Sequence, residues 1–247
     1  MKNNISKKNN KKKFISILAG IIIIIGLVLI GRYAYVRIRF YERQKTIMNA
    51  LTSTNPKVKE EANEVVAKDY KVKPLGILQI PSIGVNNGIV EGETMYDMFF
   101  GVGWNMNSPL PNMTEKETGN LVLAAHDQGY APIFSKFAKD LKPGDLAYVY
   151  LDGNTYIYQV YKMFPVEPTE VSVMNNQPDK SMLTMFTCID GGNKRMVAQA
   201  KLVDRIKGTQ LMKNDKDKPI RDFNNNEDGP YLKALREGKV NAQGQII

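Results

Sequence analysis

The sequence predicts a mainly β protein, a barrel or sandwich of short strands, preceded by one membrane-spanning helix. Three observations support this. The uncharged run at residues 14–31 is long enough to cross a bilayer, at least seven short β-like segments follow residue 74, and turn residues separate those segments. At 247 residues and 43% hydrophobic composition, the chain can form one well-packed domain with appendages.

The N-terminus divides into a basic tail, residues 1–13, and an anchor, residues 14–36. The 18 uncharged residues from Phe14 to Gly31 would span roughly 27 Å as a helix. A cleaved signal peptide is the alternative, but the apolar run is long for one, and residues 32–35 lack a small-x-small cleavage site. The tail contains no acidic residue, which favours a cytoplasmic N-terminus and an extracellular C-terminal domain at the plasma membrane.

The net charge of +9 is concentrated around this anchor. Residues 1–45 carry a net charge of +10, whereas residues 46–247 carry a net charge of −1. The basic residues therefore indicate membrane topology, and we predict no nucleic-acid partner. The single cysteine also excludes a framework of disulfides within the chain.

Residues 37–73 are charged and weakly periodic, and we expect a partly helical stalk, interrupted at Asn55-Pro56, that holds the next domain off the membrane. The predicted domain covers residues 74–207. Its strands are expected at 75–80, 85–90, 121–125, 146–151, 155–164, 181–188 and 195–203.

Helices and turns are expected between these strands. Residues 94–100 have helical spacing and end before Gly101, which suits a C-cap, and residues 132–139 resemble an amphipathic helix with proline in its first turn. Asp152-Gly153 separates two alternating segments and is typical of a β-hairpin. Residues 208–247 are polar, and we expect a mostly flexible extension with a brief helix near 230–237.

The candidate chemistry rests on one cysteine, one histidine and a nearby arginine. Cys188 and His126 each end an apolar run, where a strand end can fix a side chain near solvent. Arg195 follows Cys188 after the flexible turn Gly191-Gly192. A lone cysteine is often an inert core residue, and a lone histidine is often structural. Together, however, they match the requirements of an activated thiol nucleophile.

A metal site is a weaker interpretation of the same residues. One cysteine and one histidine cannot complete a four-ligand zinc site without two carboxylates, and no cluster has ligand spacing. Asp127 and Asp190 are expected to be solvated or to form turns. The glycine pair at 191–192 is not followed by a helix that could bind phosphate. We therefore predict neither a metal nor a cofactor.

These motifs together resemble the signature of sortases, the membrane-anchored transpeptidases of Gram-positive bacteria. The likeness consists of an Ala-Ala-His strand end, a Thr-x-x-Thr-Cys strand whose cysteine lies 62 residues later, and an arginine after a short turn. It covers roughly residues 75–203, including the opening Ile80-Pro81-Ser82-Ile83, and extends to the anchor. The resemblance implies a closed eight-stranded β-barrel and a two-step acyl transfer by a thiol peptidase.

The resemblance also implies a role for each matched residue. Cys188 corresponds to the nucleophile, His126 to the general acid and base, and Arg195 to a donor of hydrogen bonds to the oxyanion or substrate. Thr187 corresponds to a residue that helps to seat the substrate, and Ala125, where the family often has Gly or Ser, is likewise expected to contact the substrate.

The assignment of the arginine depends on strand register. Lys194 adjoins Arg195, so a shift of one residue would exchange which cation faces the cysteine.

The implied partners are secreted proteins with a C-terminal Leu-Pro-x-Thr-Gly (LPxTG) signal, cleaved between Thr and Gly, and a peptidoglycan precursor or cross-bridge amine. An Asp-Pro-aromatic lid motif typical of pilus-assembling sortases is missing, because Pro56 follows Asn55 and precedes Lys57. This favours a class A-like anchoring enzyme over a pilus-assembling one. Calcium modulation, known in some members, cannot be assigned to Glu91, Glu93, Glu167 or Glu170.

Two further interpretations stay open at the level of sequence. One is an anchored β-barrel binding module in which Cys188 is a core residue. The other is a plain cysteine protease, whose hydrolysis an added amine would not divert.

Overall fold

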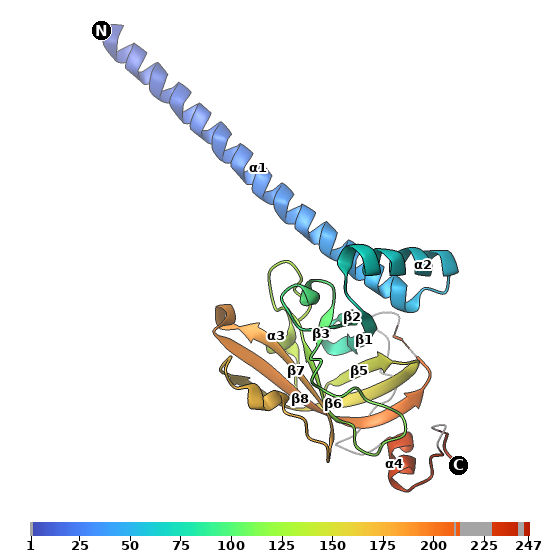
Figure 1. Ribbon diagram of the computed structural model, residues 1–247. Helices are drawn as coiled ribbons and strands as arrows, with labels where there is room; N and C mark the ends of the chain where they lie inside the picture. The colour runs from blue at the N-terminus through green and yellow to red at the C-terminus, as the bar shows by residue number, and fades with distance from the viewer. Residues whose placement is uncertain (1, 210, 213–228, 242–244) are drawn as a thin grey trace. The chain divides into compact units, whose positions relative to one another are not determined.

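The computed structural model describes residues 2–209, 211–212, 229–241 and 245–247, with side chains described from residue 14 onward (Figure 1). The chain divides into two compact units, Met1–Glu42 and Arg43–Ile247. The long helix α1 (Lys2–Thr52) contributes to both units.

The first unit is the part of α1 that carries the apolar run. The large apolar side chains between residues 14 and 30 lie exposed along the helix; Ile22 and Leu29, for example, retain 60% and 62% of their accessible surface. The most apolar window in this helix has a mean hydropathy of 3.0 and none of it is buried in protein. By length and composition the helix could therefore span a membrane, as the sequence predicts.

The second unit contains a closed barrel in the order β1-β2-β3-β4-β7-β8-β6-β5 (Figure 1). This confirms the predicted eight-stranded barrel. The strands are β1 (Pro74–Ile80), β2 (Val85–Glu91), β3 (Val102–Trp104), β4 (Gly119–Ala124), β5 (Leu146–Leu151), β6 (Asn154–Val166), β7 (Ser181–Ile189) and β8 (Lys194–Lys207). Two neighbouring pairs, β2 with β3 and β4 with β7, are parallel, and the other pairs are antiparallel. The parallel β4–β7 pair places two strand ends at the same barrel edge.

Local turn chemistry explains the hairpin between β5 and β6. Asp152 and Gly153 have φ angles of 48° and 71°, the left-handed values that a two-residue hairpin loop requires. The predicted hairpin is confirmed. Strand β3 was not predicted, because three residues carry too little periodicity to be recognised.

Two predicted helices are shorter in the structure. The 94–100 segment forms only the 3-10 helix η3 (Asp97–Phe99), and reciprocal hydrogen bonds between Thr94 and Asp97 cap its start. Gly101 does not cap it; a Cβ atom there would meet the Gly88 carbonyl oxygen, so the glycine permits close strand approach. The 132–139 segment forms turns and then α3 (Phe137–Asp140).

Residues 43–73 are part of the folded unit and not a free stalk. Asn55 caps α2 (Pro56–Val65), its side-chain oxygen accepting hydrogen bonds from the Lys57 and Val58 amides, and the π-helix η1 (Val66–Tyr70) follows. The apolar side chains of this segment pack with Val90 and Phe100 of the barrel domain. The buried members are Ile47, Ala50, Ala62, Val66 and Val72. Burial of this surface opposes the independent motion that a stalk needs.

The C-terminal extension also packs on the barrel where it is described. Helix α4 (Pro230–Arg236) buries Leu232 and Leu235, and the Asp204 carboxylate on β8 accepts hydrogen bonds from the Tyr231 and Leu232 amides at 3.1 and 3.3 Å. The brief predicted helix is confirmed, and the expectation of flexibility is wrong for this helix. The rest of that expectation falls partly on residues 210, 213–228 and 242–244, which lie outside the described residues.

Candidate active site

The β7–β8 hairpin places Cys188 directly opposite Arg195. Residues opposite each other in an antiparallel pair point to the same face, so the two side chains share a face, whereas Lys194 lies opposite Ile189 on the other face. Arg195 is half-buried and Lys194 is exposed. The register therefore brings Arg195, and not Lys194, to the cysteine.

The turn between these strands has an unusual backbone that sets this register. Asp190, Gly191 and Gly192 have φ angles of 53°, 63° and 96°. Left-handed values favour glycine, which explains the glycine pair at this position. The Arg195 Nη1 atom donates hydrogen bonds to the carbonyl oxygens of Gly192 at 2.8 Å and Lys194 at 3.2 Å. The guanidinium is thereby held at the turn that follows the cysteine strand.

His126 reaches the same edge through the parallel pairing of β4 with β7. Ala124 lies opposite Phe186, and the Ala125 amide donates a hydrogen bond to the Phe186 carbonyl oxygen at 3.4 Å. His126 and Cys188 each lie two residues beyond these partners. Because parallel strands end at the same edge, the structure brings the histidine and the thiol to neighbouring strand ends.

The surroundings of His126 leave one ring nitrogen available for chemistry. The His126 carbonyl oxygen accepts a hydrogen bond from the Phe134 amide at 2.8 Å, and the Phe99 ring lies 5.7 Å from the imidazole, centroid to centroid. The Nε2 atom is buried and has no hydrogen-bond partner among the described residues. A buried nitrogen without a partner is costly in a purely structural histidine, so this favours a functional role.

Thr187 and Ala125, predicted to bind the substrate, lie buried beside the two candidate catalytic residues. Thr187 retains only 1% of its accessible surface, and its hydroxyl donates a hydrogen bond to the Ala125 carbonyl oxygen at 2.7 Å. Ala125 is also buried. The bond joins the residue before Cys188 to the residue before His126, so it positions the two candidate catalytic residues.

Asn120 is a site-supporting residue that sequence reasoning missed. Its side chain is fully buried, accepts a hydrogen bond from the Thr184 hydroxyl at 2.8 Å, and donates to the carbonyl oxygens of Val173 and Asn175. These bonds fix the β6–β7 connection over β4 and β7, on the face that carries Cys188. A polar residue at the start of the apolar run 121–125 is the signal that could have revealed it.

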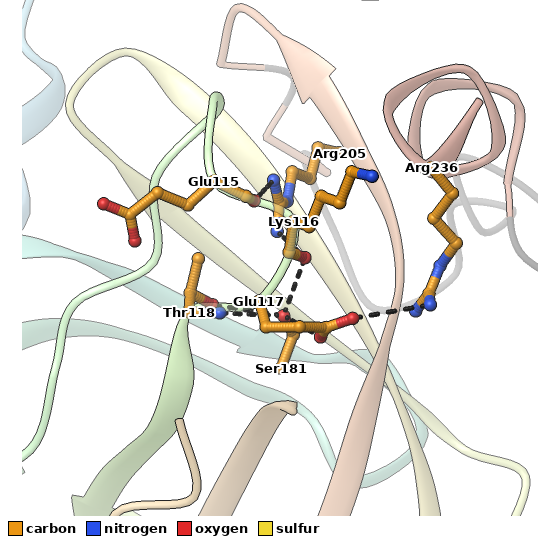
Figure 2. Close-up of polar contacts among 7 residues, drawn as sticks. All are labelled: Glu115, Lys116, Glu117, Thr118, Ser181, Arg205 and Arg236. Carbon is orange, nitrogen blue, oxygen red and sulfur yellow. Dashed lines mark hydrogen bonds and ion pairs between the residues drawn. The ribbon is translucent and has the colours of Figure 1, made fainter. Parts of the chain in front are cut away.

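The far end of β7 and β8 is held by a separate polar cluster (Figure 2). Arg205 is fully buried and donates hydrogen bonds to the carbonyl oxygens of Glu115 and Lys116, while the Ser181 hydroxyl bonds to Glu117. Burial lowers the pKa of Arg205 from its ordinary value. An ion pair of 3.4 Å joins Glu117 to Arg236 of α4. Helix α4 thus lies at the opposite end of these strands from Cys188.

Among the described residues, no group of three or more His, Cys, Asp or Glu side chains lies close enough together to hold a metal ion. Glu91 pairs with Lys73 at 2.7 Å, and Glu93 accepts a hydrogen bond from Asn105 at 2.7 Å. Burial raises the pKa of Glu93, and the Asn105 bond partly offsets that effect.

With this geometry described, comparison with known proteins identifies the family. A sortase-domain family model matches residues 78–203, which contain all three candidate catalytic residues. The chain belongs to the sortase family. Sortases are membrane-anchored cysteine transpeptidases, in agreement with the free thiol at the barrel edge and the N-terminal apolar helix.

Individual sortases resemble the chain over much of its length. A sortase A from Bacillus anthracis is 26% identical over 212 residues, covering 78% of this chain and 97% of that protein. A sortase D from Bacillus subtilis is 28% identical over 137 residues, covering 56% and 65%. The structure of a sortase D5 transpeptidase from Clostridium perfringens matches with a TM-score of 0.50 and 25% identity over 68% of this chain and 99% of that one.

The Thr187–Ala125 bond can be tested with two substitutions. Thr187→Val keeps the shape but removes the hydroxyl, leaving the buried Ala125 carbonyl oxygen without this donor, and we expect the free energy of unfolding to fall by about 1–2 kcal/mol. Thr187→Ser keeps the hydroxyl and is the matched control. Urea unfolding followed by fluorescence of Trp104, the only tryptophan, measures both. Equal stabilities of the two variants would contradict the assigned bond.

Proposed function

We propose that this sortase cleaves an LPxTG-type sorting signal between Thr and Gly and transfers the new acyl group to a cell-wall amine. The observation that supports this most directly is that Cys188 on β7, Arg195 on β8 and His126 just beyond the end of β4 lie at one barrel edge. A nucleophile, a proton carrier and a cationic hydrogen-bond donor are the groups that acyl transfer needs.

In the first half-reaction, the Cys188 thiolate attacks the carbonyl carbon of the signal's threonine. The C–S bond forms, the Thr–Gly C–N bond breaks, and protonated His126 donates its proton to the leaving amine. The released C-terminal fragment carries a free glycine amine, and the acyl group remains on Cys188 as a thioester. The chain's own side chains supply every proton and bond in this step, so the proposal contains no cofactor.

In the second half-reaction, the incoming wall amine attacks the thioester carbonyl. His126, now neutral, accepts a proton from the attacking nitrogen as the C–N bond forms and the C–S bond breaks. Cys188 leaves as a thiolate and His126 is again protonated. The cycle therefore closes without a net change in either residue.

Arg195 is proposed to stabilise the oxyanion that develops in both steps. It lies opposite Cys188 in the ladder, and a guanidinium presents several N–H donors in a planar fork. The bonds from Nη1 to two turn carbonyl oxygens orient that fork before substrate binds. Preorganised donors stabilise a transition state without the cost of reorienting water.

Within the family we propose a class A-like anchoring role and not pilus assembly. Asn55 and Pro56, the only approximation to a lid motif, serve instead as the N-cap and first helical residue of α2. The similarity to a relative named sortase A supports the class A-like role. The substrates would be secreted proteins bearing the signal, and the acceptor a peptidoglycan precursor or cross-bridge.

The proposed topology places residues 1–13 in the cytoplasm and the barrel outside the cell. Its support is the basic tail before an apolar helix. Because Cys188 is the only cysteine, a membrane-impermeant maleimide applied to intact cells should label the chain. Cys188→Ala is the control, and labelling that requires cell lysis would contradict this orientation.

The activity is tested with a quenched LPxTG peptide and triglycine. We expect the full chain in detergent micelles to cleave the peptide and to join triglycine to it, and Cys188→Ala to lose both reactions. Mass spectrometry of the products separates transfer from hydrolysis. Cleavage that Cys188→Ala retains would contradict the thiol mechanism, and hydrolysis that triglycine never diverts would indicate a plain protease.

The strand register predicts which cation matters. Arg195→Ala should lower kcat/KM for the peptide by roughly 100-fold or more, the usual effect of losing an oxyanion donor. Lys194→Ala, on the opposite face, should stay within about twofold of the unmodified chain. Arg195→Lys should remain strongly impaired because lysine lacks the planar fork. Near-full activity of Arg195→Lys would count against the oxyanion role.

A further inference from the structure

We propose that Phe99 and Tyr130 form the binding seat for the acceptor amine, beside the imidazole of His126. The inference rests on the proposed transpeptidase function and adds the location of its second substrate. The ligand class is a primary ammonium group on a flexible peptide.

The order of strands separates the two substrates around His126. In the barrel, β4 lies between β3 and β7. Cys188 ends the β7 side, so the acyl group and Arg195 occupy that side during the second half-reaction. Phe99 ends η3, which leads into β3, and Tyr130 follows β4 in the chain. Phe99 therefore belongs to a segment on the β3 side, and Tyr130 joins it there through the contact between the two rings.

Ring geometry connects this side directly to the imidazole. The Phe99 ring lies 5.7 Å from the His126 ring, and the Tyr130 ring lies 6.3 Å from Phe99 in an edge-to-face arrangement of 81°. Tyr130 remains 51% exposed, so core packing does not account for its ring. An edge-to-face pair leaves part of an aromatic face uncovered. The rings thus form a line from solvent to the proposed base.

The same chain shows how such a ring receives a cation. The Arg43 guanidinium lies 5.6 Å from the centre of the Phe100 ring, beside the neighbouring aromatic residues Tyr70 and Tyr96. A ring face attracts a cation by about 0.5–2 kcal/mol, depending on exposure. The exposed ring of Tyr130 offers a face of this kind, and the partly buried Phe99 ring links it to His126.

Aromatic rings suit an amine that must later lose its proton. A carboxylate beside the ammonium would strongly favour the charged form and oppose deprotonation. An uncharged aromatic ring binds the ammonium more weakly than a carboxylate does. The amine can therefore leave the ring once it has lost its charge. The ammonium loses one proton to solvent, then attacks the thioester and loses a second proton to His126, while Cys188 departs as a thiolate. The seat therefore concentrates the acceptor without blocking the reaction.

The test compares two nucleophiles in the full chain in detergent micelles. Triglycine is charged at neutral pH, whereas hydroxylamine is mostly uncharged. Tyr130→Leu removes the aromatic face and keeps an apolar side chain, and Tyr130→Phe keeps the ring. Tyr161→Leu, at a similarly exposed tyrosine on β6, is the control. Thioester formation with the quenched LPxTG peptide, without amine, is measured separately.

We expect Tyr130→Leu to raise the KM for triglycine roughly three- to tenfold, the loss of one cation–π contact. Its product mixture should shift toward hydrolysis, while thioester formation and the KM for hydroxylamine stay unchanged. Tyr130→Phe and Tyr161→Leu should both behave like the unmodified chain.

Three results would overturn the proposal. An unchanged triglycine KM in Tyr130→Leu would exclude the seat, and an equal rise for both nucleophiles would exclude recognition of charge. Slower thioester formation in this variant would assign Tyr130 to the peptide signal instead. Absence of any peptide cleavage by the unmodified chain would be a distinct outcome, because it would overturn the proposed function together with this inference.

Discussion

The parallel pairing of β4 with β7 is the interaction on which the active site depends. These strands lie far apart in sequence, yet their pairing from Gly119–Ser181 to Ala124–Phe186 makes them end together. The Thr187 hydroxyl extends that pairing by one more bond, to the Ala125 carbonyl oxygen. His126, just beyond the end of β4, and Cys188 on β7 are the residues that follow these bonded positions. A one-residue slip would send one of the two side chains to the opposite face and separate the pair.

The second constraint is the register of β7 against β8. Two left-handed glycines and a left-handed aspartate close the turn, so that Arg195 falls opposite Cys188 and its guanidinium bonds back to the turn. Register thus decides which of two adjacent cations lies opposite the cysteine. The two pairings of β7, one parallel and one antiparallel, bring the three candidate catalytic residues to a single barrel edge.

Buried polar side chains hold the rest of the barrel to this arrangement. Asn120 and Thr184 fix the β6–β7 connection over the face that carries the thiol, and Arg205 fixes the loop before β4 at the far end (Figure 2). A buried polar group is costly unless it is hydrogen-bonded, so each bond penalises alternative loop positions. The catalytic edge is consequently supported by contacts at both ends of β7, while its reactive side chains remain partly exposed.

The sequence by itself determined the strands with clear alternation, the hairpin at Asp152-Gly153, the apolar helix and the candidate groups Cys188, His126 and Arg195. Periodicity and turn chemistry are local, and a single cysteine and histidine leave few alternatives. Only the tertiary structure decided the order of strands, the choice of Arg195 over Lys194, and the interior positions of Thr187 and Ala125. The tertiary structure also shows that residues 43–73 and α4 pack onto the barrel. Their burial depends on partners distant in the chain, and local sequence patterns do not encode such partners.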